Sequence, residues 1–543
     1  MPSRTSFLRR ATAFLALAAL ALTARAQTIT FEAEYCMRVG TTVASSAPGY
    51  SGTGYVTGFD ATGDLVRSNF TATAGLYNLL IRFRTPNGNK GFNATLNGTG
   101  LSGMFPATNN FSTFNAGLVQ LVTGVNTFEL GGGWNWYEID RFDFVPVAVP
   151  GPPLPVSGTL VDTQATFAAR VLMQRVVDDY GKHTLSGQHD TSDITFIYNT
   201  SGRKPVFMEG DFIEYSPSRV EHGSNPGNYT ENCIALESSG YILSFCWHWN
   251  APTNLIDTAG HEWWSGFYTH ATTFDVQAAL ANTNSAEYSL LLRDIDAIAV
   301  QLKKLASNNI PVLWRPLHEP DGGWFWWWAK GAVPFKQLWR LMFNRLTVYH
   351  GLHNLIWTLA ISEPSRYPEW YPGNDVVDVV GIDAYPSDKG DPLSGQWEAL
   401  KALWDGVKPI ALTEFGGVPD IEKMQNNYGV WWAWFCPWVG MVSSMPTSTI
   451  VRIYQSPAVI TLDEFNAVPP FITSINSLGG GVFQLMGTGP RGATNPILSA
   501  TNLNQPMNSW SQISTGKFAG GVFTYTDTQF TNDSQRFYRV FKP

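Results

Sequence analysis

The segment Ile310-Pro-Val-Leu-Trp-Arg-Pro-Leu-His-Glu319 is a short apolar run that ends in a carboxylate and is followed by Pro-Asp-Gly-Gly. A second segment of the same kind, Pro409-Ile-Ala-Leu-Thr-Glu-Phe-Gly416, carries Glu414 near its end. Apolar runs of this length bounded by glycine and proline are typical of strands buried on both faces. A carboxylate at the tip of such a strand is unfavourable unless the tip opens into a polar site. The two segments therefore predict buried strands that deliver both glutamates to a functional site.

Eight such runs alternate with helix-like segments between residues 159 and 468. The runs are His183–Asp190, Lys204–Phe212, Tyr241–Trp249, Ile310–Glu319, Asn354–Ser362, Val376–Pro386, Pro409–Gly416 and Tyr428–Trp438. Eight strands with intervening helices over roughly 300 residues close most simply into a (β/α)8 TIM barrel. An open doubly wound sheet is the alternative, but the sequence has no glycine-rich phosphate loop to support it. In a barrel, the fourth and seventh strands would end at Glu319 and Glu414, on the face that carries active sites.

Two smaller modules are expected on either side of the barrel. Short strands separated by Gly and Asn turns over residues 27–147 predict a β-sandwich of the jelly-roll type. The proline-rich stretch over residues 148–158 predicts an extended linker. Residues 469–543 return to short strands and predict a small β-rich module, whose role the sequence does not indicate. The chain is therefore expected to be multidomain.

The first 26 residues have the parts of a secretory signal peptide. Arg4, Arg9 and Arg10 precede a short apolar core, and an Ala-Arg-Ala triplet stands directly before Gln27. The apolar core is too short for a membrane span, and no other stretch approaches about 20 uninterrupted apolar residues. We therefore expect cleavage before Gln27 and a secreted protein with no membrane span.

The composition favours a carbohydrate ligand. Charged residues make up 14% of the chain and aromatic residues 14%, with 21 tryptophans, which is more than core packing readily explains. Flat, weakly charged indole surfaces suit the apolar faces of sugars. The net charge of −8 gives no support to nucleic-acid or anionic-membrane binding. A monomer is the default expectation for the assembly.

The four cysteines are Cys36, Cys233, Cys246 and Cys436, and none shows the CxxC spacing of a zinc or redox motif. Export permits disulfides, and Cys233 with Cys246 is the most plausible pair by distance along the chain. The alternative, that all four are buried free thiols, stays open.

Glycoside hydrolysis needs two carboxylates, one to protonate the leaving oxygen and one to attack carbon or activate water. Acids on the fourth and seventh strands would face each other across a barrel mouth, which favours the short separation of retaining enzymes. The acid needs a raised pKa, which the apolar segment Trp324–Trp328 after Glu319 could produce by desolvation. A metal mechanism is disfavoured, because neither His189-Asp190 nor Trp247-His-Trp249 belongs to an HExxH or His-x-His pattern.

Three further residues could support the two glutamates. Tyr385, at the end of the sixth run, could donate a hydrogen bond to the nucleophile. Arg315, low on the fourth run, could supply positive charge beneath it. His318 could position the sugar or the acid.

Several of these strings resemble glycoside hydrolase family 26, over about residues 159–467. Trp314-Arg-Pro-Leu-His-Glu319 resembles its acid/base segment, and Leu412-Thr-Glu-Phe-Gly416 its nucleophile segment. Further matches are Gly187-Gln-His-Asp190, Trp247-His-Trp-Asn250 and Asp383-Ala-Tyr385. The family consists mostly of endo-β-1,4-mannanases with retaining (β/α)8 barrels. The resemblance implies Glu319 as acid/base and Glu414 as nucleophile, Tyr385 as a hydrogen-bond donor to the nucleophile, and sugar subsites formed by His318, Trp249, Trp324 and Trp434.

The N-terminal region is similar to carbohydrate-binding module family 35. The similarity rests on Phe31-Glu-Ala-Glu34, Gly49–Val56, Gly75–Asn78 and Gly133–Asp140. Such modules usually hold a structural calcium ion, and the matching acids are Glu32, Glu34 and Asp140. Three hard oxygen ligands from separate strands are what Ca²⁺ favours. Trp134 or Trp136 could stack on a sugar face, since an indole covers the apolar C–H groups of a pyranose.

Together these features predict a secreted, retaining endo-β-1,4-mannanase that acts on β-mannan, with no catalytic cofactor and with structural Ca²⁺ in its N-terminal module. A β-1,3-xylanase or a mixed-linkage β-glucanase of the same family is the alternative within enzymes. A non-catalytic polysaccharide-binding protein is the alternative from another class, and a metal-dependent deacetylase is a third.

Overall fold

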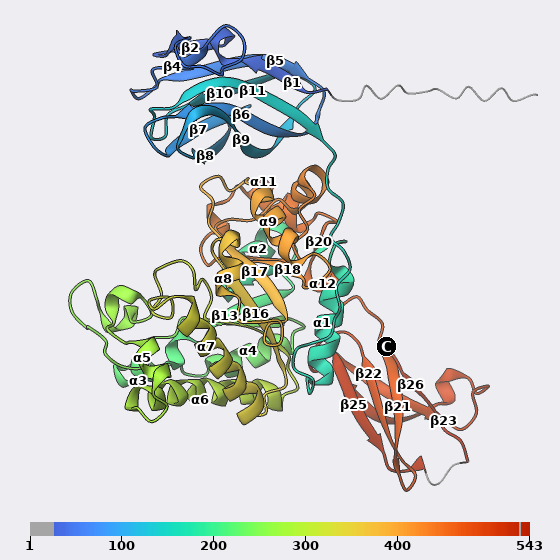
Figure 1. Cartoon of the computed structure of the whole chain (residues 1–543). Helices are drawn as coiled ribbons and strands as arrows, with labels where there is room; N and C mark the ends of the chain where they lie inside the picture. The colour runs from blue at the N-terminus through green and yellow to red at the C-terminus, as the bar shows by residue number, and fades with distance from the viewer. Residues whose placement is uncertain (1–26, 531–533, 543) are drawn as a thin grey trace, which may run out of the picture. The chain divides into compact units, whose positions relative to one another are not determined.

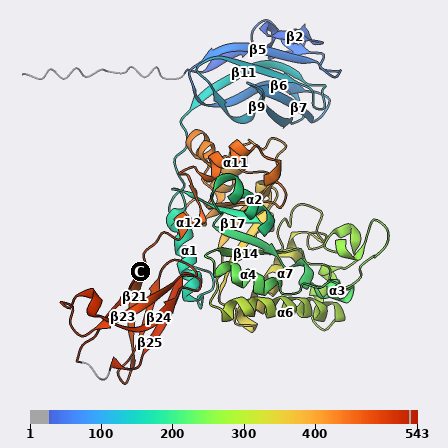
Figure 2. The ribbon, with the colours of Figure 1, turned by 180° about the vertical axis from the view of Figure 1, so that it is seen from behind.

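The computed structural model describes residues 27–530 and 534–542, so the expected signal peptide lies outside the described residues. The chain divides into two compact units, Met1–Ala148 and Val149–Pro543, drawn in Figures 1 and 2. Each unit is described by itself below.

The first unit is a sandwich of two antiparallel sheets. Its strands are β1 (Ile29–Glu32), β2 (Met37–Val39), β3 (Thr42–Ala44), β4 (Tyr55–Thr57), β5 (Leu65–Ala72), β6 (Gly75–Thr85), β7 (Lys90–Leu96), β8 (Thr99–Phe105), β9 (Thr108–Leu121), β10 (Gly124–Gly131) and β11 (Glu138–Val147). One sheet has the order β3-β4-β11-β6-β9, with β1 paired to β11, and the other has the order β2-β5-β10-β7-β8. In β6, Leu79, Ile81 and Phe83 are fully buried while their neighbours are half-buried, the period of two expected of a strand. The predicted β-sandwich is confirmed.

The second unit is built on a closed ring of parallel strands. The strands are β12 (Thr184–His189), β13 (Phe207–Asp211), β14 (Ile242–Trp247), β15 (Val312–Pro316), β16 (Leu355–Ile361), β17 (Val379–Ala384), β18 (Ile410–Phe415) and β19 (Trp434–Pro437). They pair in sequence order, and β12 pairs with both β13 and β19, which closes the barrel. A short ninth strand, β20 (Val459–Ile460), adds to β12. Nearly every strand residue is buried, as expected when helices cover the outer face. The predicted TIM barrel is confirmed, with Glu319 after its fourth strand and Glu414 in its seventh.

Helices lie outside the barrel strands (Figures 1 and 2). They are α1 (Phe167–Asp179), α2 (Thr191–Ser201), α3 (Pro217–Glu221), α4 (Tyr229–Glu237), α5 (Val276–Ala281), α6 (Ala286–Ser307), α7 (Ala332–Phe343), α8 (Tyr367–Trp370), α9 (Ser394–Trp404), α10 (Ile421–Lys423), α11 (Thr447–Tyr454) and α12 (Leu462–Phe465). The longest, α6, begins at the N-cap Ser285, whose hydroxyl accepts the N–H of Tyr288 at 3.0 Å. It buries Leu291, Ile295 and Ile298, the spacing of one helix face. Among the described residues, no helix has the length and apolar content needed to cross a bilayer.

The C-terminal strands form a small module within the second unit. They are β21 (Phe471–Gly479), β22 (Val482–Thr488), β23 (Thr494–Ala500), β24 (Ser511–Lys517), β25 (Val522–Asp527) and β26 (Phe537–Val540). Two three-stranded sheets, β21-β22-β25 and β24-β23-β26, enclose a core of Leu485, Ile497, Phe518, Phe523 and Val540. The expected β-rich module is therefore present, although its core is small.

All four cysteines are free thiols. Cys246 lies inside β14, where its thiol points to the carbonyl oxygen of Gly210 at 3.6 Å, whereas Cys233 lies on α4. The pairing of Cys233 with Cys246 is wrong, and the alternative of free thiols holds. The two cysteines are close in sequence but do not form a disulfide, because Cys246 lies in a barrel strand and Cys233 lies on a helix outside the barrel.

Candidate active site

Three carboxylates converge at the C-terminal ends of three barrel strands. Glu319 follows β15, Asp383 lies in β17 and Glu414 lies in β18. One oxygen of each lies within 4.8 Å of the others, and all three side chains are buried. The predicted convergence of Glu319 and Glu414 is therefore confirmed, and Asp383 is an addition to it.

The backbone at Glu319 is strained. Leu317 and Glu319 adopt φ values of 50° and 49°, in the left-handed region that residues with a side chain rarely occupy. The N–H of Glu319 donates to the carbonyl oxygen of Ala360 at 2.9 Å, which ties this turn to the end of β16. Strained backbone that tertiary contacts hold in place is common where a side chain must be aimed at a site.

Glu414 is surrounded by hydrogen-bond donors. Arg315 Nη2 donates to its Oε1 at 2.6 Å, and the Tyr385 hydroxyl donates to its Oε2, as predicted. His318 Nε2 lies 4.0 Å from Oε1. Burial and the charge of Glu414 raise the pKa of Tyr385 far above its ordinary value, so the phenol keeps its proton and remains a donor. These contacts hold the carboxyl group of Glu414 in a fixed orientation.

Arg315 lies beneath the site with its guanidinium fully engaged. It donates to Glu209 at 2.9 Å, to Asp383 at 2.8 Å and to Glu414 at 2.6 Å. Only 1% of Arg315 is exposed, which agrees with its expected place beneath the nucleophile, whereas a direct contact between Arg315 and substrate stays a prediction. A guanidinium has five N–H donors in one plane. Those of Arg315 fix the positions of three acids that come from three different strands. Arg315 therefore positions Glu414.

Glu319 has a different environment. Its Oε2 accepts one hydrogen bond, from Trp324 Nε1 at 2.7 Å. Burial and then the nearby charge of Glu414 raise the pKa of Glu319 to about 7, although the Trp324 bond and the charge of Arg315 act in the opposite direction. A carboxyl group with that pKa is protonated in a substantial fraction of molecules near neutral pH.

A chain of imidazoles leads away from Glu414. His318 Nε2 lies 3.2 Å from His248 Nε2, and His248 Nδ1 lies 2.6 Å from Asp211 Oδ2. Burial and then the charge of Arg315 depress the pKa of His318 strongly. Burial also acts to lower the pKa of His248, but the attraction of Asp211 outweighs it and the pKa is raised. His318 is 1% exposed and contacts Glu414 and His248, and its role in a sugar subsite stays a prediction.

Comparisons with known proteins identify the barrel. The model of glycosyl hydrolase family 26 matches residues 161–464, and that of carbohydrate-binding module family 35 matches residues 29–147. A mannan endo-1,4-beta-mannosidase of Thermothelomyces thermophilus is 43% identical over 441 residues, which cover 80% of this chain and 90% of that protein. The chain belongs to glycoside hydrolase family 26. The resemblance noted in the sequence is thereby confirmed.

Solved structures support the same family. The crystal structure of a Podospora anserina GH26-CBM35 β-(1,4)-mannanase matches with a TM-score of 0.60 and 42% identity, covering 82% of this chain and 99% of that one. A β-mannanase from a symbiotic protist of the termite Reticulitermes speratus, complexed with gluco-manno-oligosaccharide, matches with a TM-score of 0.52 and 28% identity. That match covers 57% of this chain and 98% of the protist protein.

Two of the tryptophans expected in the subsites of this family 26 barrel are buried in the protein. Trp249 is 0% exposed, donates its indole N–H to Asp294 Oδ2 at 2.8 Å and stacks on Trp247. Trp434 is 3% exposed and packs edge-on against Phe207 in the barrel interior. Their burial gives no support to the subsite roles, which stay predictions.

Other aromatic side chains do face solvent at the site. Trp324, expected in a subsite, and Tyr385, expected to donate to the nucleophile, are 40% and 45% exposed, so both are accessible to a substrate. Trp438, which the sequence analysis did not select, is half-buried and packs against His189 with ring centres 4.0 Å apart and the rings tilted by 32°. The only signal for it in the sequence was its place at the end of the eighth apolar run.

A cavity of about 280 Å³ lies near the family 26 site, although Glu319, Asp383 and Glu414 do not line it. Its lining includes His189, Glu209 and Asp211, at or near the C-terminal ends of β12 and β13. Glu209 also bonds Arg315, so the cavity shares a wall with the network beneath Glu414. Neither Glu209 nor Asp211 was selected from the sequence. Both lie in one expected strand segment, Lys204–Phe212, which carries no motif that indicates a site.

In the family 35 module, the acids expected to hold calcium gather around one loop. Ser51 donates through Oγ to Glu32 Oε2 at 2.7 Å and through N to Asp140 Oδ1 at 2.9 Å, and the N–H of Thr53 donates to Glu34 Oε1 at 2.7 Å. The other oxygen, Glu34 Oε2, is buried without a hydrogen-bond partner. Burial, together with the neighbouring acids, raises the pKa of Glu32. These observations fit a bound cation, although Asp140 also contacts Arg82 Nε at 2.7 Å.

The exposed tryptophans of the module are Trp134 and Trp136, at 63% and 55%. Trp136 borders a hollow of about 180 Å³ that also includes Asp60, Asn87 and Glu138. The ring of Trp134 lies outside that lining and covers the backbone at Gly91. Because Trp136 lines the hollow and Trp134 does not, Trp136 is a candidate for stacking on a sugar in addition to the predicted Trp134.

Proposed function

We propose that this chain is a retaining endo-β-1,4-mannanase that hydrolyses β-mannan by double displacement. The observation that carries the mechanism is the separation of at most 4.8 Å between oxygens of Glu319 and Glu414. Retaining glycosidases place their carboxyl groups about 5–5.5 Å apart, whereas inverting enzymes leave about 6.5–9.5 Å for a water molecule. The polymer is inferred from the relatives, which are named mannan endo-1,4-beta-mannosidases.

In the first step, Glu414 attacks the anomeric carbon while Glu319 donates its proton to the departing glycosidic oxygen. A covalent glycosyl ester on Glu414 results. In the second step, Glu319 accepts a proton from water, the water oxygen bonds to the anomeric carbon, and the ester bond to Glu414 breaks. Arg315 and Tyr385 hold the carboxylate of Glu414 throughout.

The assignment of acid and nucleophile follows from the two environments. Glu319, whose pKa is raised to about 7, carries the proton that a general acid needs. Glu414 accepts hydrogen bonds from a guanidinium and a phenol, which orient it for attack on the anomeric carbon. Pairs of acids whose environments differ in this way mark acid and nucleophile in glycosidases.

The decisive experiment is the product profile from mannohexaose followed by anomeric NMR. We expect internal cleavage and a β-anomer as the first product, which defines endo action and retention together. Parallel assays on β-1,3-xylan and lichenan address the other specificities of the family. Hydrolysis of lichenan alone, or an α-anomer as the first product, would exclude the proposal.

Variants of the two acids separate the enzyme from a non-catalytic binding protein. Glu319→Gln removes the proton donor, which contributes about 10²–10⁴-fold to such reactions. Glu414→Ala removes the nucleophile and should abolish turnover while polysaccharide binding persists. Residual hydrolysis equal to that of the unchanged chain in both variants would contradict the assignment.

For the N-terminal module we propose polysaccharide binding through Trp136 and Trp134. Indole faces stack on the apolar face of a pyranose, and both rings are more than half exposed. In affinity electrophoresis through a gel that contains mannan, binding slows the migration of the protein. The variant Trp136→Ala should be slowed less than Trp134→Ala. Retardation unchanged in the double variant would place the binding face elsewhere.

We also propose that Glu32, Glu34 and Asp140 hold a structural Ca²⁺ ion. A bound ion would satisfy Glu34 Oε2 and offset the repulsion among the three acids. Calorimetry should show that the melting temperature of the module rises when Ca²⁺ is added and falls when a chelator is added. The variant Glu34→Gln should remove that dependence. Hydrolysis of mannan by the barrel should survive chelation, which would exclude a metal-dependent deacetylase.

Export remains a proposal, since the leader lies outside the described residues. N-terminal sequencing of protein from culture medium should begin at Gln27. Size-exclusion chromatography with light scattering tests the expected monomer.

A further inference from the structure

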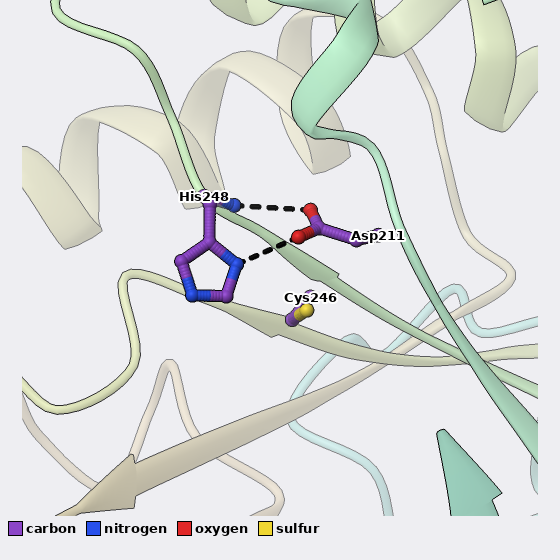
Figure 3. Close-up of side chains that lie close together, drawn as sticks. All are labelled: Asp211, Cys246 and His248. Atoms are coloured by element: carbon purple, nitrogen blue, oxygen red, sulfur yellow. Dashed lines mark hydrogen bonds and ion pairs between the residues drawn. The ribbon is translucent and has the colours of Figure 1, made fainter. Parts of the chain in front are cut away.

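Outside the carboxylate cluster, a second group of potential ligand atoms lies at the ends of β13 and β14. Asp211, Cys246 and His248 each place one such atom within 4.8 Å of the others (Figure 3). Asp211 and Cys246 are register partners in adjacent strands, and His248 follows two residues later. The group therefore combines one oxygen, one sulfur and one nitrogen on a rigid part of the barrel.

The thiol is the least engaged member of this group. Asp211 Oδ2 lies 2.6 Å from His248 Nδ1, and Asp211 Oδ1 accepts the N–H groups of Ile213 and His248 at 2.9 and 3.1 Å. The Cys246 thiol makes one long contact, to Gly210 O at 3.6 Å. In Figure 3 the sulfur lies beside the Asp211–His248 pair. No step of the proposed hydrolysis uses Cys246.

The cavity at the ends of β12 and β13 reaches one member of this group, Asp211, whereas Cys246 and His248 lie behind its lining. Its lining contains four carboxylates, those of Asp190, Glu209, Asp211 and Glu214. It also contains His189, which is 8% exposed and has two buried ring nitrogens without a hydrogen-bond partner in the described part of the chain. Clefts lined by one sign of charge concentrate ions of the opposite sign.

We propose that Asp211, Cys246 and His248 form a binding site for a borderline-soft divalent cation such as Zn²⁺ or Cd²⁺, and that its occupation inhibits the catalytic centre. Thiolate and imidazole ligands select such ions over Mg²⁺ and Ca²⁺, which prefer oxygen. Bonds form from the metal to Cys246 Sγ, His248 Nδ1 and Asp211 Oδ2. The protons on the thiol and on Nδ1 pass to solvent, no electron is transferred, and water completes the coordination.

Inhibition follows from the position of His248. An ion bound between Nδ1 and Asp211 must widen their separation beyond 2.6 Å, because two metal–ligand bonds of about 2 Å at a tetrahedral angle hold the ligand atoms roughly 3.3 Å apart. The imidazole then shifts relative to His318, which its Nε2 contacts at 3.2 Å and which lies 4.0 Å from Glu414. This second part of the proposal rests on the proposed function of Glu414, whereas the binding of the ion does not.

The test titrates the chelator-washed chain, beginning at Gln27, with Cd²⁺ at fixed pH. Ultraviolet absorption from thiolate-to-metal charge transfer reports the Cd–S bond, and mannan hydrolysis reports inhibition. We expect both signals to rise together and to be reversed by a chelator, with no effect of Mg²⁺. In Cys246→Ser the absorption should disappear and inhibition should need at least about tenfold more Cd²⁺, as for the loss of a metal contact.

Matched controls are Cys233→Ser and Cys36→Ser, which remove the other thiols outside the barrel strands and should retain both signals. If Cys246→Ser fails to fold, as judged by circular dichroism, Cys246→Ala replaces it. Absorption and inhibition that persist unchanged in the folded Cys246 variant would overturn the proposal. Absorption that depends on Cys246 in a chain without mannan hydrolysis would instead support the metal site and contradict the proposed function.

Discussion

At the scale of single residues, the two glutamates show how surroundings assign opposite roles to the same side chain. Both end short apolar strands, yet Glu414 receives hydrogen bonds from Arg315 and Tyr385. Glu319 receives one neutral N–H, from Trp324, in a buried setting. Burial without a cationic partner favours the protonated form, whereas charged donors favour the ionised form. The chemistry therefore depends on the neighbours of each carboxylate more than on its type.

A first prediction concerns the alkaline limb of the pH profile. Glu319 must be protonated to act as the acid, so kcat/KM should fall as the pH rises through about 7. Trp324 lowers the pKa of Glu319 through its hydrogen bond, so Trp324→Phe should move that limb to higher pH. Trp328→Phe, in the same segment but without a bond to Glu319, is the control. If the alkaline limb of Trp324→Phe stays at the same pH, the hydrogen bond from Trp324 does not control the pKa of Glu319.

At the scale of elements, the barrel depends on the pairing that joins its first and second strands. Three residue pairs connect β12 to β13, and one of them is Gly187 with Phe207. A Cβ atom on Gly187 would approach the Phe207 ring to 2.0 Å. Glycine is required here for a close approach between a backbone and a ring. The same strands carry His189 and Asp211 into the cavity beside the site.

We therefore expect Gly187→Ala to destabilise the protein by about 1–3 kcal/mol, the usual effect of overpacking a core. Urea unfolding followed by tryptophan fluorescence measures this change. Gly395→Ala, in α9 where no atom lies within 4 Å of the added methyl group, is the control and should be stabilising by about 0.4–1 kcal/mol. Equal stability of the two variants would contradict the close approach.

At the scale of the whole second unit, the C-terminal module is attached to the barrel through buried polar groups. Arg491 Nη2 lies 3.4 Å from Glu237 Oε1, at the end of α4, and the same oxygen accepts the N–H of Gly520 at 2.8 Å. Arg491 Nε also donates to Tyr241 O at 3.4 Å, one residue before β14. These contacts favour a module that unfolds together with the barrel.

Removing one partner of that pair leaves a buried charge without its counterion. Arg491→Met should cost about 3–5 kcal/mol, whereas the double variant Glu237→Gln/Arg491→Met should recover part of the loss. Calorimetry measures both, with the exposed Lys517→Ala as the control. A melting temperature of Arg491→Met equal to that of the unchanged chain would show that the module folds independently of the barrel.

The barrel and its two glutamates could be predicted from the sequence, because buried parallel strands need continuous apolar runs and barrel chemistry needs polar residues at their ends. The order of the eight strands and the places of Glu319 and Glu414 followed directly from that pattern. The donation from Tyr385 to Glu414 also followed, because a residue at the end of the sixth strand is a neighbour of the seventh.

What only the tertiary structure decided is which side chains beside those strands reach the open site. Trp249 and Trp438 each end an expected apolar run, yet Trp249 is fully buried and Trp438 is half-buried beside His189. The group of Asp211, Cys246 and His248 likewise joins two strands whose register no local pattern specifies. Hydrophobic periodicity determines which face of an element is buried, but the proximity of polar atoms depends on distant segments packing together, and that is a property of the whole fold.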